Sequence, residues 1–132
     1  MEKCIFCRIV SGNAQAFVVY EDAKTLAFLD KRPQSWGHIQ LIPKIHCRWI
    51  YDVPNIGSFF EVAQKLIRGI IPVLGASHVT LASYGREVEH AHLWIVPQYY
   101  QEVRVEEGRI TKNHDLSALH KLLETALREE VS

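Results

Sequence analysis

The sequence lacks the features of several protein classes. Its 132 residues include three cysteines and no long apolar run, and 15 basic residues balance 15 acidic ones. An odd number of cysteines does not suit a disulfide framework and fits a reducing compartment. Balanced charge argues against a broad nucleic-acid footprint, though not against a small phosphate site. No stretch reaches the roughly 18 apolar residues of a transmembrane helix, and the first twelve residues do not resemble a signal peptide. We therefore expect a cytoplasmic protein that binds neither membranes nor nucleic acid.

The composition is that of an ordinary globular domain, with 48% hydrophobic and 23% charged residues. A short helix is predicted to end at Ser11-Gly12. A long amphipathic helix is predicted from Pro54, closed by Pro72 and Gly75. Strands are expected at 17–20, 25–30, 38–43, 78–84 and 91–96, with a possible edge strand at 102–105 and a last helix at 115–130. Hairpins combined with one long helix predict an α+β domain with an antiparallel sheet.

A histidine doublet opens the strand expected at 91–96. Because strand side chains alternate, His90, His92 and Trp94 are expected on one face of the sheet, which we expect to be partly open. Two imidazoles at positions i and i+2 form a common metal-ligand arrangement. They are about as often surface or core-edge histidines, and the doublet alone does not separate the two interpretations.

The segment Cys4-Ile5-Phe6-Cys7 is a C-x-x-C motif, which serves zinc binding or thiol redox chemistry. A redox motif normally follows a strand, and no strand is expected before Cys4. Zinc needs two further ligands, for which the candidates are His38, His46, Cys47, His78, His90 and His92. A third interpretation is that the two thiols simply pack as small hydrophobic groups.

Taken in order, several blocks of the chain resemble the histidine-triad (HIT) family, in its branch of nucleoside phosphoramidases and dinucleoside polyphosphate hydrolases. The blocks are residues 4–12, 19–22, 26–30, 33–34, 37–38 and 41–46, and the doublet followed by Ile95-Val96-Pro97. The resemblance implies the HIT-like fold, an antiparallel sheet of about five strands with a long central helix and a C-terminal helix. It places the HIT-like domain at residues 1–100 and a C-terminal extension with a helix at residues 101–132.

The resemblance also implies chemistry at the α-phosphate of a nucleotide. In the family, the middle histidine of H-x-H-x-H attacks the α-phosphorus and forms a nucleotidyl-histidine, which water or another acceptor then resolves. That nucleophile matches His92, and His38 and His90 match further active-site histidines. Asp30 matches the acceptor of the ribose hydroxyls, and the apolar pocket for the base matches Phe6, Ile9 and Phe28. The remaining nucleotide contacts match Ser83 and Trp94.

Three further properties follow from the resemblance alone. The ligand is expected to be a purine nucleotide, and the protein is expected to form a homodimer. A structural zinc is expected in a closed set of four ligands, which match Cys4, Cys7, His46 and His90.

The chain departs from the family pattern around its third triad position. Trp94 replaces a histidine, and an indole donates one hydrogen bond but cannot exchange a proton. The stretch 84–89 is shorter than the family's glycine-rich loop, with Glu87 in the place of a serine, and Ala82 or Ser83 replaces an asparagine. Three interpretations stay open. The first is a hydrolase or transferase that uses His92, and the second is a HIT-fold nucleotide- or partner-binding protein with little catalysis. The third is a small zinc-stabilised domain whose histidines are all structural.

Overall fold

The computed structural model describes residues 3–100 and 115–131, so the strand expected at 102–105 lies outside the described residues. In chain order the elements are α1 (Ile5–Val10), β1 (Val18–Glu21), β2 (Thr25–Leu29), β3 (Ile39–Pro43), the 3-10 turn η1 (Ile50–Asp52), α2 (Ile56–Leu74), β4 (His78–Ala82), β5 (Leu93–Gln98) and α3 (Leu116–Val131). The strands form an antiparallel sheet in the order β1-β2-β3-β5-β4. The predicted α+β class, with about five strands, a long helix and a C-terminal helix, is confirmed.

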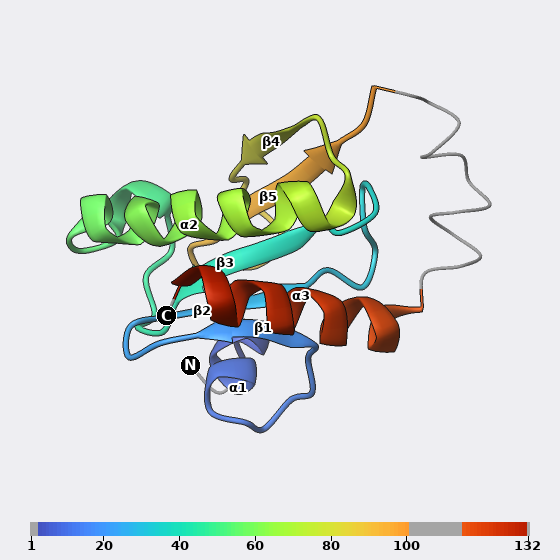
Figure 1. Cartoon of the computed structure of the whole chain (residues 1–132). Helices are drawn as coiled ribbons and strands as arrows, with labels where there is room; N and C mark the ends of the chain where they lie inside the picture. Colours follow the sequence, from blue (N-terminus) through green and yellow to red (C-terminus); the bar gives the residue numbers. More distant parts are fainter. Residues whose placement is uncertain (1–2, 101–114, 132) are drawn as a thin grey trace.

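The sheet separates two layers of packing (Figure 1). The helices α2 and α3 cover one face, where Leu66 and Leu123 pack against residues such as Ile39 and Ile95. Helix α1 covers the opposite face, where Phe6 packs against Phe28. Alternate residues of β2 and β3 point to opposite faces, and this alternation divides their side chains between the two layers.

Strand β5 begins at Leu93, two residues later than predicted, so the histidine doublet precedes the strand. The carbonyl of Pro43, at the end of β3, accepts a hydrogen bond from the imidazole of His90 at 2.9 Å. Pro43 itself has no N–H to donate. The backbone N–H of Ala91 donates instead to the carbonyl of Cys47 at 2.6 Å. The β3–β5 ladder therefore ends at the pair Leu41–Leu93.

The long helix continues through Pro72 and ends at Leu74, whereas the sequence predicted that Pro72 would help to close it. A proline so near the end removes one hydrogen bond and leaves only two residues of helix beyond it. Gly75 closes the helix in the left-handed conformation, as expected. Of the leucines of α3, Leu119, Leu123 and Leu127 are buried, whereas Leu122 is exposed, and the apolar spacing alone predicts all four on one face. Within the described residues, no helix combines the length and apolarity needed to cross a membrane.

Candidate active site and metal centre

His92 is held in one orientation by the backbone. Its Nδ1–H donates to the carbonyl of His90 at 2.9 Å, so Nε2 carries the lone pair. The backbone N–H of Tyr84 donates to this Nε2 at 3.3 Å. His92 is 5% exposed and His90 is fully buried, so the two imidazoles are covered, whereas Trp94, which was expected on the same face, is half-buried. The ring of Phe6 makes edge contacts with both imidazoles, with centroids 5.8 and 6.0 Å away, because α1 lies over them.

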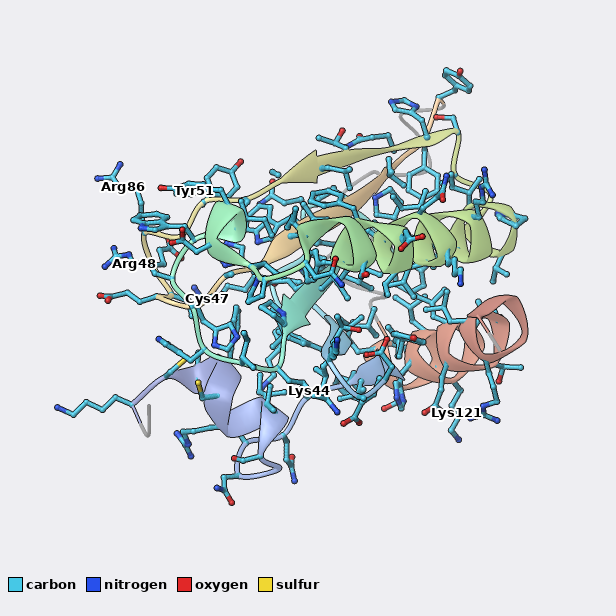
Figure 2. The ribbon with its side chains drawn as sticks, turned by 90° about the vertical axis from the view of Figure 1, so that its left-hand side faces the viewer. Lys44, Cys47, Arg48, Tyr51, Arg86 and Lys121 are labelled. Carbon is cyan, nitrogen blue, oxygen red and sulfur yellow. The ribbon has the colours of Figure 1, made fainter. Side chains whose placement is uncertain are left out.

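The short loop 83–89 packs against the side chain of Trp49. Gly85 has a φ of +81°, and a Cβ built on it would lie 2.7 Å from the Trp49 ring. The guanidinium of Arg48 stacks 4.6 Å above the same ring and pairs with Glu89 at 2.9 Å. Figure 2 shows Arg48 and Arg86 projecting at this end of the molecule. Arg48 therefore offsets the charge of Glu89, one of the two acidic side chains of this loop.

Three of the residues expected to contact the nucleotide base come together between α1 and the sheet. The rings of Phe6 and Phe28 pack edge to face with centroids 5.3 Å apart, and Ile9 packs against the same cluster. We call Phe6, Ile9 and Phe28 the apolar subsite. Ser83, also expected to contact the nucleotide, lies exposed just after β4.

Asp30, His38 and Gln40 form a polar cluster beside the apolar subsite. Nε2 of Gln40 donates to Oδ2 of Asp30 at 2.9 Å, and Nε2 of His38 lies 3.7 Å from the same oxygen. Burial lowers the pKa of His38, against the opposing effect of the Asp30 carboxylate, so the ring is neutral at pH 7. Nε2 of His38 and Oε1 of Gln40 are buried without a partner among the described residues. Each such atom costs about 1–3 kcal/mol of folding free energy.

Gln40 was not among the residues expected in the site. It is a polar residue in the middle of the buried strand β3 (Ile39–Pro43), and two-residue alternation places it on the same face as His38. That pattern was the available signal. The ring of Trp94 packs against the ring of His38 with centroids 4.8 Å apart, and the Tyr84 ring contacts Trp94 at the same distance. Trp94, which stands at the third triad position of the sequence, therefore lies beside the polar cluster.

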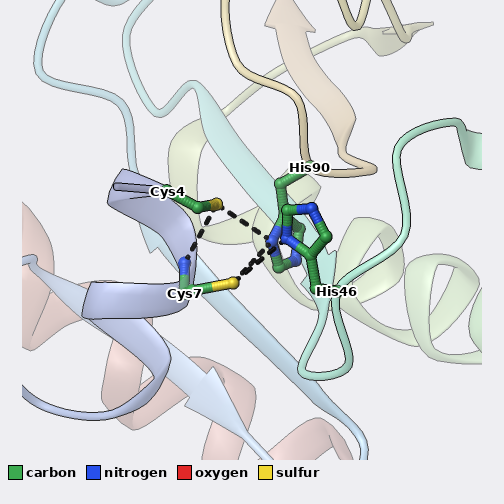
Figure 3. A group of neighbouring side chains, drawn as sticks. All are labelled: Cys4, Cys7, His46 and His90. Carbon is green, nitrogen blue, oxygen red and sulfur yellow. Dashed lines mark hydrogen bonds between the residues drawn. The ribbon is translucent and has the colours of Figure 1, made fainter. Parts of the chain in front are cut away.

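The four residues expected to bind zinc converge in the fold (Figure 3). One donor atom from each of Cys4, Cys7, His46 and His90 lies within 4.8 Å of every other. Nδ1 of His90 is 3.4 Å from Sγ of Cys4, and Nδ1 of His46 is 3.1 Å from Sγ of Cys7. Donor atoms of a tetrahedral Cys2His2 zinc site lie about 3.3–3.8 Å apart. The nitrogen–sulfur separations of 3.1–3.5 Å are close to this range, and two thiols with two imidazoles are a common zinc ligand set, so these residues fit a four-coordinate metal.

The surroundings of the cluster keep the Cys7 thiol protonated unless a cation is bound beside it. Burial and the neighbouring Cys4 raise the pKa of Cys7 to about 11, so this thiol needs a cation to become a ligand. Burial lowers the pKa of His90, although its bond to Pro43 opposes this, and keeps the ring neutral. Because Nε2–H of His90 donates to the Pro43 carbonyl, Nδ1 presents its lone pair to the cluster.

His90 contacts both the two cysteines and His92. Its ring faces Cys4 and Cys7 through Nδ1. Its carbonyl holds the Nδ1–H of His92. The orientation of His92 thus depends on His90, which is also a member of the Cys4, Cys7, His46 and His90 cluster.

Comparison with known proteins gives a consistent result. The HIT domain family model matches residues 11–101. An uncharacterized HIT-like protein of Methanocaldococcus jannaschii is 34% identical over 125 residues, which cover 89% of this chain and 96% of that protein. The adenosine 5'-monophosphoramidase of Candida albicans is 30% identical over 98% of this chain and 91% of its own length. A zinc-bound histidine triad family protein from Mycobacterium smegmatis superposes with a TM-score of 0.82 at 30% identity, over 97% of this chain and 95% of that one.

Proposed function

We propose a function from one premise, that the chain belongs to the HIT domain family. The proposal is a hydrolase or transferase that acts at the α-phosphate of a nucleoside phosphoramidate or a dinucleoside polyphosphate. The observation that carries it is the fixed orientation of His92, whose Nδ1–H is held by a carbonyl while Nε2 keeps its lone pair. A neutral imidazole held in this way is the form that a nucleophile requires near pH 7.

The proposed reaction has two displacements at phosphorus. Nε2 of His92 forms a bond to the α-phosphorus while the bond to the leaving group breaks. A polyphosphate departs as an anion, whereas a leaving amine takes a proton from solvent because the Trp94 indole cannot supply one. Water then attacks the same phosphorus, loses a proton to solvent, and displaces His92 as the nucleoside monophosphate is released. The Tyr84 N–H must leave Nε2 before the first step, and it then lies within reach of a phosphoryl oxygen. His90 acts in this scheme as a positioning residue, since both of its ring nitrogens face other groups.

The proposed ligand is a purine nucleotide. The apolar subsite would hold the base, and the carboxylate of Asp30 would accept the ribose hydroxyls. His38, Ser83 and Trp94 would border the sugar and the phosphate. The location of Trp94 next to His38 and Tyr84 supports its place at the phosphate end of the site.

We further propose that Cys4, Cys7, His46 and His90 hold one zinc ion. Bound there, zinc would supply folding free energy and no reactive position, because the four ligands fill a tetrahedral shell. The donor spacing supports this assignment. A cytoplasmic location and a homodimer complete the proposal. Phe60 on α2 and Leu81 on the edge strand β4 are exposed apolar side chains, which a second chain could cover.

A second candidate function is nucleotide binding with little catalysis. Two observations favour it, the replacement of the third histidine by Trp94 and the N–H of Tyr84 on the nucleophile's lone pair. Turnover separates the candidates. Purified protein is incubated with adenosine 5'-phosphoramidate and with a diadenosine polyphosphate, and His92→Ala is the control. The proposed enzyme releases adenosine monophosphate and the variant does not. Binding of nucleotide without release by the wild-type protein selects the second candidate.

A further inference from the structure

The polar cluster of Asp30, His38 and Gln40 holds hydrogen-bonding capacity that the described residues leave unused. Oε1 of Gln40 is an acceptor without a donor, and Nε2 of His38 also has no partner. The backbone N–H of Gln34 donates to Nδ1 of His38 at 3.0 Å, so the neutral ring carries its proton on Nε2. The separation of 3.7 Å between this nitrogen and Asp30 is too long for a hydrogen bond. The cluster therefore presents one free donor and one free acceptor.

A hydroxyl group matches both kinds of unused capacity, because it donates through its hydrogen and accepts through its oxygen. It would donate to Oε1 of Gln40 and accept from Nε2–H of His38. A hydroxyl on the adjacent carbon would donate to Asp30, whose side chain keeps 14% of its surface exposed. A phosphate would meet the negative charge of Asp30, and an ammonium group could not accept from His38. The chemistry of the cluster thus fits a neutral vicinal diol.

The cluster lies where the sugar of a nucleotide would be needed. Gln40 pairs with Phe28 of the apolar subsite on one side and with Trp94 on the other. A diol bound there would lie between the proposed base pocket and the proposed phosphate end. Trp94 is half-buried and packs on the His38 ring, so its indole is the side chain that must turn aside for a sugar to enter.

We propose that Gln40 is a specificity-determining residue that selects nucleotides with an intact ribose 2',3'-diol over deoxyribonucleotides. His38 completes the sugar site by donating to the same hydroxyl. This inference rests on the proposed function, since it assigns the sugar of the proposed nucleotide ligand. Leucine in place of Gln40 would reduce the selection about tenfold and would remove the unpaired buried oxygen.

Calorimetric titration tests the inference with adenosine monophosphate, its 2',3'-dideoxy analogue and ribose 5-phosphate. The wild-type protein should bind the dideoxy analogue at least about 100-fold more weakly than adenosine monophosphate. Gln40→Leu should weaken adenosine monophosphate about tenfold and leave the dideoxy affinity unchanged. Gln98→Leu, the same change at the far end of β5, should keep the wild-type pattern. Gln40→Met serves if the leucine variant does not fold, and the melting temperature of either folded variant should not fall.

The outcomes separate the inference from the function on which it rests. Equal wild-type affinity for the two adenosine ligands overturns the role of the diol and leaves nucleotide binding intact. An equal loss for both ligands in Gln40→Leu overturns the role of Gln40. Ribose 5-phosphate that binds as tightly as adenosine monophosphate overturns the assignment to nucleotides. Failure of the wild-type protein to bind either adenosine ligand overturns the inference and the proposed function together.

Discussion

The backbone N–H of Tyr84 donates a hydrogen bond to Nε2 of His92, the nitrogen proposed to attack phosphorus. At 3.3 Å this bond is at the long, weak end of the range, so a substrate can replace it. The neighbour of Tyr84 is Gly85, whose positive φ and contact with the Trp49 ring fix the loop. The availability of the nucleophile therefore depends on a glycine that lies outside the histidine motif.

Gly85→Ala should displace this loop. The new Cβ would lie 2.7 Å from the Trp49 ring and would also occupy a left-handed backbone conformation. We expect the free energy of unfolding to fall by about 2–4 kcal/mol. We also expect His92 to react faster with diethyl pyrocarbonate, as measured by peptide mapping, because Tyr84 no longer covers Nε2.

Gly12→Ala is the matched control, since Gly12 has a φ of +85° and nothing within 4 Å of an added Cβ. It should cost only about 1–2 kcal/mol from backbone strain and leave the reactivity of His92 unchanged. Wild-type reactivity of His92 in Gly85→Ala would contradict the link between the loop and the nucleophile.

Cys7→Ser should remove the metal and the stability that it supplies. We expect close to one zinc per chain in the wild-type protein and little in the variant, measured by elemental analysis. With free zinc about 100-fold above its Kd, the variant should lose about 2.7 kcal/mol of stabilisation. Cys47→Ser is the control. Cys47 is outside the cluster, so this variant should keep the zinc. Stoichiometric zinc in a chain without Cys4 and Cys7 would exclude the proposed centre.

Trp94→His should increase release of amine from a nucleoside phosphoramidate. An indole cannot supply the proton that a leaving amine needs, whereas an imidazole can, and such a group contributes about 10²- to 10⁴-fold. Polyphosphate leaving groups, which depart as anions, should gain less. Steady-state rates with both substrates measure the difference, and Trp94→Phe should not reproduce the gain. Unchanged amine release in Trp94→His, with a wild-type protein that is already fast, would mean that Trp94 only fills space.

Tyr20→Phe should change how stability depends on alkaline pH. Burial and the 2.7 Å bond from Tyr20 to Asp22 raise the pKa of Tyr20 from 10.0 to about 12. The folded protein thus keeps the phenolic proton to higher pH than the unfolded chain, and this contribution is full below about pH 10 and lost toward about pH 12. Urea unfolding should show wild type about 1 kcal/mol more stable at pH 7. A difference that stays constant up to pH 12 would contradict the bond.

The sequence predicted those elements whose pattern is local. Helix α1 ends at Val10, before Ser11-Gly12, as the glycine signal indicates, and the apolar period of α2 marked its long helix correctly. The start of β5 could not be predicted in this way, because the imidazole of His90 donates to the carbonyl of Pro43, which is far away in the sequence. Which residues pair there is decided by tertiary contacts, which a periodicity does not contain.

Some residues of the candidate site could likewise be predicted from the sequence, and others could not. Motif spacing identified Cys4, Cys7 and the histidine doublet, and the family resemblance supplied His46, which the fold brings to the same cluster. Gln40 and Trp49 carry no motif. Their contacts with Asp30 and Gly85 depend on strand register and on a loop from another part of the chain. Only the three-dimensional fold brings these two side chains to the site.

The most direct test of the central claim is detection of a covalent nucleotide on His92. The wild-type protein is incubated with adenosine 5'-phosphoramidate or a diadenosine polyphosphate, quenched in base because a phosphoramidate bond is labile in acid, and digested for mass spectrometry. The account predicts an adenylyl group on the peptide that contains His92, and none in His92→Ala. Turnover that persists in His92→Ala, or an adenylyl group on another residue, would contradict it.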